Sequence, residues 1–340
     1  MSLAIALAER GLAPDWLVRL GIRRLLRERL RDESRTSAEQ GAAALGQFAE
    51  RCRHGSIAVE TAAANEQHYE TPTAFFQTIL GPRLKYSSCL YEKSSTSLAD
   101  AESAMLQTAS ERADLRDGQA ILELGCGWGS WALWMAEKFP RASIVAVSNS
   151  RTQKTFIDDR AKALGLGNLE VVTCDMNRFA PDRSFDRIVS VEMFEHMRNF
   201  RELLRRIASW LTPEGRLFVH IFCHRTLAYP FDTAGDDNWM GRHFFTGGMM
   251  PSFDWLRRFP EDLKVEADWR VNGVHYARTL EDWLVNLDRQ RRELLQLFPS
   301  AIAARQLQRW RMFLMACAEL FAHDGGNEWF VGHYRLRRAD

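Results

Sequence analysis

Two carboxylates and an imidazole stand close together near the middle of the chain, at Glu192, Glu195 and His196. They follow a predicted strand, Phe185 to Val191, and so fall in the loop at its carboxyl end. A carboxylate attracts a cationic nitrogen and an imidazole accepts a proton, so these residue types suit general-base chemistry. The structural alternative is that N–H groups of a neighbouring helix satisfy them. Because loops at this edge of a sheet often carry function, we expect all three to be catalytic.

The same stretch does not predict a metal site. The di-iron spacing E-x-x-H would need a carboxylate where the chain has Met193. His220 and His224 are four positions apart, but they fall on a predicted strand and lack the helical H-E-x-x-H arrangement. His220 is therefore either a core histidine or part of a pocket wall. We expect no metal cofactor.

Three alternate glycines, Gly125, Gly127 and Gly129, form a second chemical feature. They separate a predicted buried strand, Ala120 to Leu124, from a helical pattern that resumes near Trp131. Glycine lets the backbone turn sharply and bring its N–H groups close to a ligand. Dinucleotide-binding loops have the pattern G-x-G-x-x-G, but a serine stands where the third glycine would be. The spacing E-x-G-x-G-x-G is typical of the nucleotide loop of S-adenosylmethionine (SAM) dependent methyltransferases, and an ordinary tight turn is the simpler alternative.

Polar residues also follow the next two predicted strands. Ligands of open α/β sheets bind at the carboxyl ends of the strands, so these positions are candidates for cofactor contacts. An acid that would bind the ribose of NAD is missing before Asp158, which further disfavours a dinucleotide. An acidic acceptor beside an apolar side chain could hold a purine. The candidates are Ser148, Asn149 and Gln153 after the second strand, and Asp175 with Met176 after the third.

The elements that position these residues alternate between strand and helix, which predicts a mostly parallel α/β sheet. After residue 227 an aromatic-rich and glycine-rich stretch predicts a lid over residues 228–258. Helices are predicted at 16–30, 38–53, 98–115, 151–164, 200–211, 279–298 and 301–321, and strands at 120–124, 143–147, 169–173, 185–191, 216–222 and 264–271, with 329–336 as a final edge strand. Residues 213–215 are expected to form a turn. We expect an N-terminal helical segment (1–80), a Rossmann-like core (81–227), a lid and helical cap (228–325) and a last core strand (326–340).

The amino-acid composition and net charge limit the classes of function that this chain can have. The chain has 340 residues, of which 46% are hydrophobic and 26% charged, as in soluble globular proteins. A formal net charge of +1 implies no general attraction to nucleic acid. The six cysteines include no C-x-x-C pair, and the N-terminus lacks a basic region of the kind found in secretory signals. These features favour a cytoplasmic protein with free thiols.

A basic amphipathic helix is expected near the N-terminus, where apolar residues at helical spacing alternate with arginines between Trp16 and Arg31. Such a helix can lie on an anionic membrane surface. It can equally pack within a helical subdomain or form a contact between two copies in a homodimer. Because Glu28, Asp32 and Glu33 dilute its positive charge, we favour packing over membrane contact.

Several stretches together make the family recognisable. The chain resembles the cyclopropane-fatty-acid synthase superfamily of SAM-dependent methyltransferases, and within it the coclaurine (benzylisoquinoline) N-methyltransferase branch. The resemblance covers nearly the whole chain. It is carried by residues 84–89 (LKYSSC), the glycine loop, 147–150 (VSNS) with Gln153, 190–197 (SVEMFEHM), 218–224 (FVHIFCH), 244–248 (FFTGG) and 272–277 (NGVHYA).

The resemblance implies a class I methyltransferase fold with a helical substrate cap, SAM as cofactor and S-adenosyl-L-homocysteine as product. Tyr86 and Ser87 would close over the cofactor. The glycine loop would hold its aminoacyl end, Ser148, Asn149 and Gln153 the ribose region, and Asp175 with Met176 the adenine. Val191 is also expected to contact the cofactor. The cluster Glu192, Glu195 and His196 matches the catalytic Glu-x-x-Glu-His of the N-methyltransferase branch.

The chain departs from the cyclopropane synthases at one place. In those enzymes a cysteine, a glutamate, a histidine and a tyrosine surround a bicarbonate that acts as base. Glu195, His220 and Tyr276 match three of these groups, but Ser88 stands at the cysteine position, with Cys89 displaced by one. Glu192 also stands where the synthases usually have a small residue. The departure favours methylation of an amine over cyclopropanation of a phospholipid acyl chain.

Aromatic residues late in the chain could form a wall for a small aromatic amine, whose cation they would stabilise. Ordinary core packing is the alternative for each of them. The expected substrate-binding set is Trp239, Phe244, Phe245, Phe321 and Trp329, together with His220 and Tyr276. We therefore expect an amine N-methyltransferase, with a lipid-modifying enzyme and a non-catalytic SAM-binding protein as the other classes.

Overall fold

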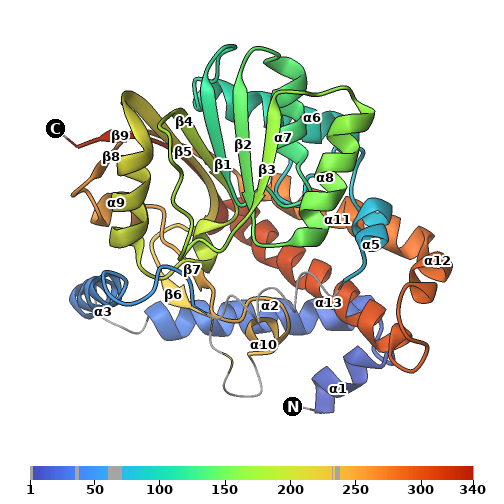
Figure 1. The fold of residues 1–340 in the computed structure, drawn as a ribbon. Coiled ribbons are helices and arrows are strands. Elements are labelled where there is room, and N and C mark those ends of the chain that lie inside the picture. Colours follow the sequence, from blue (N-terminus) through green and yellow to red (C-terminus); the bar gives the residue numbers. More distant parts are fainter. Residues whose placement is uncertain (1–2, 35–37, 60–70, 232, 234–237, 340) are drawn as a thin grey trace.

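The computed structural model describes residues 3–34, 38–59, 71–231, 233 and 238–339 (Figure 1). A seven-stranded sheet lies at its centre, with strand order β3-β2-β1-β4-β5-β9-β8. The strands are β1 (Ala120–Leu124), β2 (Ser143–Ser148), β3 (Leu169–Thr173), β4 (Phe185–Val191), β5 (Leu211–His224), β8 (Leu263–Val271) and β9 (Trp329–Arg338). Strands β1 to β5 pair in parallel, whereas β9 runs antiparallel to both β5 and β8.

Helices cover the sheet, and in Figure 1 α9 lies on one side of it while α6, α7 and α8 lie on the other. Polar side chains begin three of the helices, because Ser97, Ser150 and Asn199 each accept a hydrogen bond from a backbone N–H of the first turn. The covering helices are α6 (Leu98–Arg112), α7 (Ser130–Lys138), α8 (Arg151–Ala163) and α9 (Phe200–Trp210), whereas α5 (Thr73–Ile79) packs into an apolar cluster with residues late in the chain. The mostly parallel α/β sheet predicted from the sequence is confirmed.

Shorter elements and a helical pair complete the described part of the chain after the fourth strand. The short elements are η1 (Phe194–His196), β6 (Tyr229–Pro230), α10 (Trp239–His243), β7 (Met249–Met250), η2 (Trp255–Arg258) and η3 (His323–Gly326). The pair consists of α11 (Gly273–Arg289), continued by α12 (Arg291–Gln296), and α13 (Ala303–Ala322), and α13 crosses below the sheet in Figure 1. The predicted division of the chain at residues 80, 227 and 325 stays a prediction.

Three predictions about these elements are wrong. The last strand, β9, is not at the edge, because it inserts between β5 and β8 and leaves β8 at the edge. Its first six residues are all buried, as in a strand that is covered on both faces. The turn expected at residues 213–215 lies within β5, which absorbs it by a register shift against β4. The helix expected at 279–298 is divided into α11 and α12, and α11 begins earlier, at Gly273.

The N-terminal helices α1 (Leu3–Glu9), α2 (Asp15–Ser34) and α3 (Ala38–Arg51) precede the sheet. One side of α2 packs against the apolar cluster that includes α11 and α13. Arg19 also donates to Glu281 at 2.6 Å and to Glu319 at 3.0 Å, and Arg23 donates to Glu319. The basic helix is therefore packed, as favoured from the sequence.

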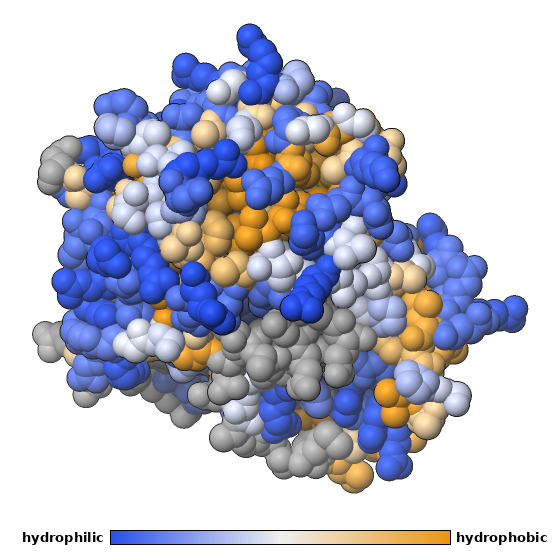
Figure 2. Space-filling model, viewed as in Figure 1, coloured by the Kyte–Doolittle hydropathy of each residue, from blue (hydrophilic) through white to orange (hydrophobic). Residues whose placement is uncertain are grey.

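Hydrophilic residues occupy most of the molecular face shown in Figure 2 and surround its hydrophobic areas. Among the described residues, no helix has the length and apolarity needed to cross a membrane.

Candidate active site

A cavity of about 810 Å³ lies between the carboxyl ends of β1 to β4 and the helices α1, α2, α11 and α13. Figure 1 shows α2 and α13 crossing beneath this edge of the sheet. Most of the predicted site residues line the cavity. They are Tyr86, Ser87, Gly125, Gly127, Ser148, Asn149, Gln153, Asp175, Met176, Val191, Glu192, Glu195, His196, Trp239, Phe245, Tyr276 and Phe321.

The glycine loop forms one end of this cavity. Gly125, Gly127 and Gly129 all have positive φ angles, which side-chain-bearing residues adopt at a cost. A Cβ on Gly127 would meet no protein atom within 4 Å, so the space above this residue belongs to the cavity. Gly129 has another role, because a Cβ there would lie 2.7 Å from Ile157 in the core.

A buried carboxylate beside the loop lacks a full set of partners. Glu123 is 2% exposed, and its Oε2 has no hydrogen-bond partner in the described part of the chain. Burial raises the pKa of Glu123 to about 8. A buried acceptor of this kind calls for a donor from a ligand, and the cationic amino group of SAM is one. The open space at Gly127 and this orphaned oxygen together fit the aminoacyl end of the cofactor.

The next two strand ends hold their polar residues through local contacts. Ser148 donates to the Gln153 side chain at 2.7 Å, and both side chains are buried against the cavity. Asp175 accepts from the backbone N–H of Asn177 at 2.7 Å, which orients its carboxylate, and Met176 is buried next to it. These positions can hold a ribose and a purine respectively.

Glu192 is held by hydrogen-bonding groups from three separate parts of the fold. Its Oε1 accepts from the Ser88 backbone N–H at 3.2 Å and lies 3.3 Å from His220 Nε2, and its Oε2 accepts from Tyr276 Oη at 2.6 Å. Burial raises the pKa of Glu192, whereas the Tyr276 hydrogen bond and the charge of Lys85 oppose this shift. The backbone φ of Glu192 is +45°, a strained value for a residue other than glycine.

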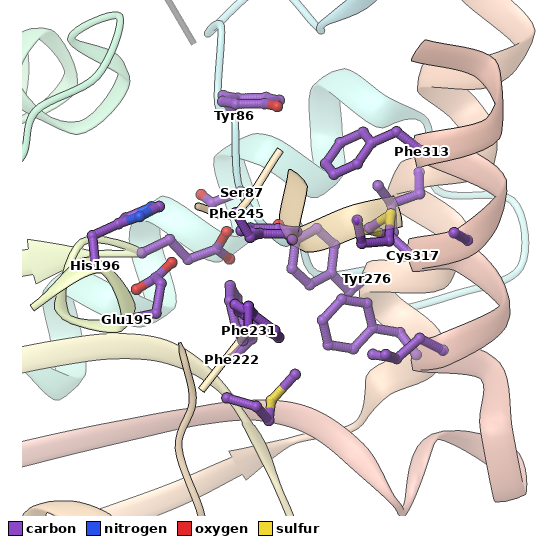
Figure 3. Close-up of a pocket in the computed structure, with 18 of the residues that line it drawn as sticks. Tyr86, Ser87, Glu195, His196, Phe222, Phe231, Phe245, Tyr276, Phe313 and Cys317 are labelled. Atoms are coloured by element: carbon purple, nitrogen blue, oxygen red, sulfur yellow. The ribbon is translucent and has the colours of Figure 1, made fainter. Parts of the chain in front are cut away.

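Glu195 and His196 lie on η1, directly after Glu192. Glu195 is 1% exposed, and its Oε2 has no hydrogen-bond partner in the described ranges. Burial, and the nearby Glu192 carboxylate, raise the pKa of Glu195 well above its usual range. In Figure 3 Glu195 and His196 project into the cavity from one side, and Tyr276, Phe313 and Cys317 face them from the other.

A buried cation behind this cluster was not predicted from the sequence. Lys85 is 3% exposed, and its Nζ donates to the Ser87 hydroxyl and to the Ser88 carbonyl, the latter at 2.6 Å. Burial lowers the pKa of Lys85, while nearby groups including Cys89 and Glu192 oppose the shift. The sequence did contain one indication that this lysine is buried, because its neighbours along the chain are an apolar and an aromatic residue.

Aromatic side chains line the end of the cavity that faces Glu195. Figure 3 shows Phe222, Phe231, Phe245 and Phe313 around this space, and Tyr276 stacks on Phe321 with ring centroids 4.4 Å apart. Phe222, Phe231 and Phe313 were not predicted, although Phe313, Cys317 and Phe321 recur at helical spacing on α13.

Three residues expected to bind substrate lie outside the lining. Phe244 stacks on Phe313 behind the cavity surface, with ring centroids 4.2 Å apart. Trp329 is fully buried on β9, where its Nε1 donates to Tyr229 Oη at 3.2 Å. His220 is buried on β5 and reaches the cavity through Glu192.

Comparison with known proteins agrees with this geometry. The family model described as mycolic acid cyclopropane synthetase matches residues 58–328. The (S)-coclaurine N-methyltransferase of Thalictrum flavum subsp. glaucum is 35% identical over 338 residues, covering 97% of this chain and 94% of that protein. The cyclopropane-fatty-acyl-phospholipid synthase of Escherichia coli (strain K12) is 31% identical over 220 residues, covering 64% of this chain and 54% of that protein. A crystal structure of coclaurine N-methyltransferase bound to N-methylheliamine and SAH has a TM-score of 0.94, with 33% identity and 98% of both chains covered.

Fold and site therefore define a class I, SAM-dependent methyltransferase. The chain belongs to the mycolic acid cyclopropane synthetase family, and it is similar over nearly its full length to coclaurine N-methyltransferases.

Proposed function

We propose that this protein transfers the methyl group of SAM to the nitrogen of a small aromatic amine. The observation that carries the proposal is the orphaned Oε2 of Glu195, a buried acceptor that faces an aromatic wall. A protonated amine would donate to this oxygen while its aromatic part contacts Phe245, Phe313 and Tyr276. The full-length similarity to coclaurine N-methyltransferases supports the same substrate class.

Each residue of the site has a separate role in the proposed methyl transfer. Bound SAM supplies a sulfonium methyl group, which a neutral nitrogen can attack. Glu192 and Glu195 attract and orient the acceptor ammonium, and His196 accepts its proton to free the lone pair. Alignment of the acceptor by the aromatic wall reduces the orientational freedom that a bimolecular transfer would have to lose, an effect that can reach ~7–11 kcal/mol in well-aligned systems.

The cyclopropane-synthase alternative is weakened by Glu192. The resemblance implies that a histidine, a tyrosine and a glutamate of those enzymes surround a bicarbonate base. In this chain Tyr276 already donates to Glu192, and His220 Nε2 lies 3.3 Å from the same carboxyl group. A built-in carboxylate at this place favours the binding of a cationic nitrogen. The 31% identity with the Escherichia coli synthase keeps an acyl chain as the second candidate acceptor.

The test is methyl transfer from isotope-labelled SAM, offered in parallel to a panel of arylalkylamines and to vesicles of unsaturated phospholipid, with products identified by mass spectrometry. We expect label in amines. Label in acyl chains alone would overturn the proposal and establish a lipid-modifying enzyme. The Glu195→Gln, His196→Ala double variant is the control, and unchanged activity in it would show that these two residues are not catalytic.

A further inference from the structure

A line of hydrogen-bonded side chains runs across the sheet from α6 to Glu192. Arg112 Nη1 lies 2.8 Å from His333 Nδ1, and His333 Nε2 lies 2.9 Å from His220 Nδ1. His220 Nε2 then lies 3.3 Å from Glu192 Oε1. The two histidines are 0% and 1% exposed, so the line is sealed from solvent along its middle.

Arg112, at the end of the line away from Glu192, sets the direction in which each hydrogen bond is donated. The guanidinium of Arg112 can only donate, so His333 Nδ1 must accept. Burial, reinforced by the positive charges of Arg112 and Lys85, holds the pKa of both histidines well below the usual range, and both rings are therefore neutral. A neutral imidazole carries one N–H. His333 consequently donates from Nε2 to His220 Nδ1, and His220 donates from Nε2 to Glu192.

The sheet register keeps the members of the line side by side. His220 on β5 is paired directly with His333 on β9, and Val191, the residue before Glu192, is paired with His220. The two imidazole ring centroids are 4.7 Å apart. Arg112 is held at the other end by the ring of Trp269, whose centroid is 5.3 Å from its guanidinium. This arrangement exists because β9 lies inside the sheet.

We propose that Arg112, His333 and His220 form a one-way hydrogen-bond chain that keeps an N–H donor aimed at Glu192 and so holds Glu192 as a carboxylate. His333 and Arg112 are positioning residues, since they act on Glu192 through His220. A proton taken from the acceptor cannot leave along this chain, because Arg112 has no lone pair to accept one. Glu192 is thereby an anchor for the cationic nitrogen, and His196 is left to accept its proton, as in the proposed function.

Other groups also act on Glu192, and any pH effect must be assessed against them. Lys85 and the donors Ser88 and Tyr276 favour its charged form, whereas burial opposes it. The titratable groups that face it are Lys85, Tyr86 and Cys89 from the segment before α6, Glu195 from η1, His220 from β5, Tyr276 from α11 and Cys317 from α13.

The first test measures the tautomers directly and requires no substrate. Histidine rings are labelled with ¹⁵N in the full chain, and one-bond and two-bond couplings show which nitrogen carries the proton. Signals are assigned with the His220→Gln and His333→Gln variants. We expect both rings to be neutral and protonated on Nε2 between pH 6 and 9, a window of about three units around neutrality. Protonation of either ring on Nδ1 would overturn the proposed direction.

The second test rests on the proposed function, because it follows amine methylation against pH. Loss of the His220 donor disfavours the carboxylate form, so the acid limb of kcat/KM should move upward by about one pH unit in His220→Leu. His333→Leu should move it in the same direction, and His333→Gln should restore it, because a glutamine can accept from Arg112 and donate to His220.

The matched control is His224→Leu. His224 is another buried histidine on β5, but its ring accepts from the backbone of Thr226 and Leu227 and does not line the cavity. Its acid limb should stay at the wild-type pH even if the protein loses stability. An unshifted limb in His333→Leu with methylation retained would overturn the role of His333. If no amine is methylated, the proposed function fails. The direction of the hydrogen-bond chain is then tested by the tautomer measurement alone.

Discussion

The cofactor end and the acceptor end of the cavity are assembled from the chain in different ways. At the cofactor end, short stretches of consecutive residues follow successive strands, from Gly125 to Met176. At the acceptor end, Glu192 is held by residues from the segment before α6, from β5 and from α11. The comparison teaches that the residues after the strands are positioned by local backbone shape, whereas the surroundings of Glu192 depend on long-range packing.

The largest expected effect is at the cofactor end. Gly127→Val should abolish SAM binding, with affinity lower by ~100-fold or more, because the side chain would fill the cavity and Gly127 has a φ of +51°. Isothermal titration with SAM measures this. Gly165→Val is the control, since Gly165 also has positive φ and open space but lies outside the cavity lining. A normal dissociation constant in Gly127→Val would contradict the loop assignment.

A large effect confined to turnover is expected at the acceptor end. His196→Ala should lower kcat by ~100-fold or more, through loss of the general base, and leave SAM affinity almost unchanged. Steady-state kinetics and SAM titration separate the two quantities. His54→Ala, at an exposed histidine on the surface, is the control. If SAM binding fell as much as turnover, His196 would belong to the cofactor end instead.

A smaller effect should reveal how the carboxylate is held. Tyr276→Phe removes the 2.6 Å hydrogen bond to Glu192, and kcat/KM should fall by ~10-fold. Burial already raises the pKa of Glu192, and loss of this donor raises it further, so activity should be lost at a higher pH as the pH falls. The pH profile checks the sign. Tyr91→Phe removes a comparable hydrogen bond to Asp282 outside the cavity and should leave the profile in place.

The smallest expected effect concerns the N-terminal helix that closes the acceptor end. Glu9 on α1 is fully buried and accepts from Trp239 at 2.7 Å and from Arg309 at 3.1 Å. Glu9→Gln should cost about 1–3 kcal/mol of unfolding free energy and raise the KM for the amine a few-fold, with unchanged SAM affinity. Denaturant unfolding and kinetics test this, with Glu28→Gln at an exposed ion pair as control. An equal loss of SAM affinity would contradict the separation of the two ends.

The positions of the residues that follow the strands could be predicted almost completely from the sequence. Strands β1, β3 and β4 have the predicted bounds, and the residues after each strand line one cavity. The cluster Glu192, Glu195 and His196 could be located for the same reason, because it follows a strand directly. Hydrophobic periodicity and glycine spacing are properties of neighbouring residues, so a sequence carries them without knowledge of the rest of the fold.

The tertiary structure alone decided what surrounds these residues. The alternation within β9 could not show that both its edges would be paired, and therefore could not show that His333 would lie opposite His220. Phe244 and Trp329 could not be distinguished from the aromatic side chains that line the cavity, because burial depends on what packs against them. Tyr276 and His220 contact Glu192 by hydrogen bonds, and Lys85 acts on it by its charge. These interactions arise only when distant segments meet in the folded chain.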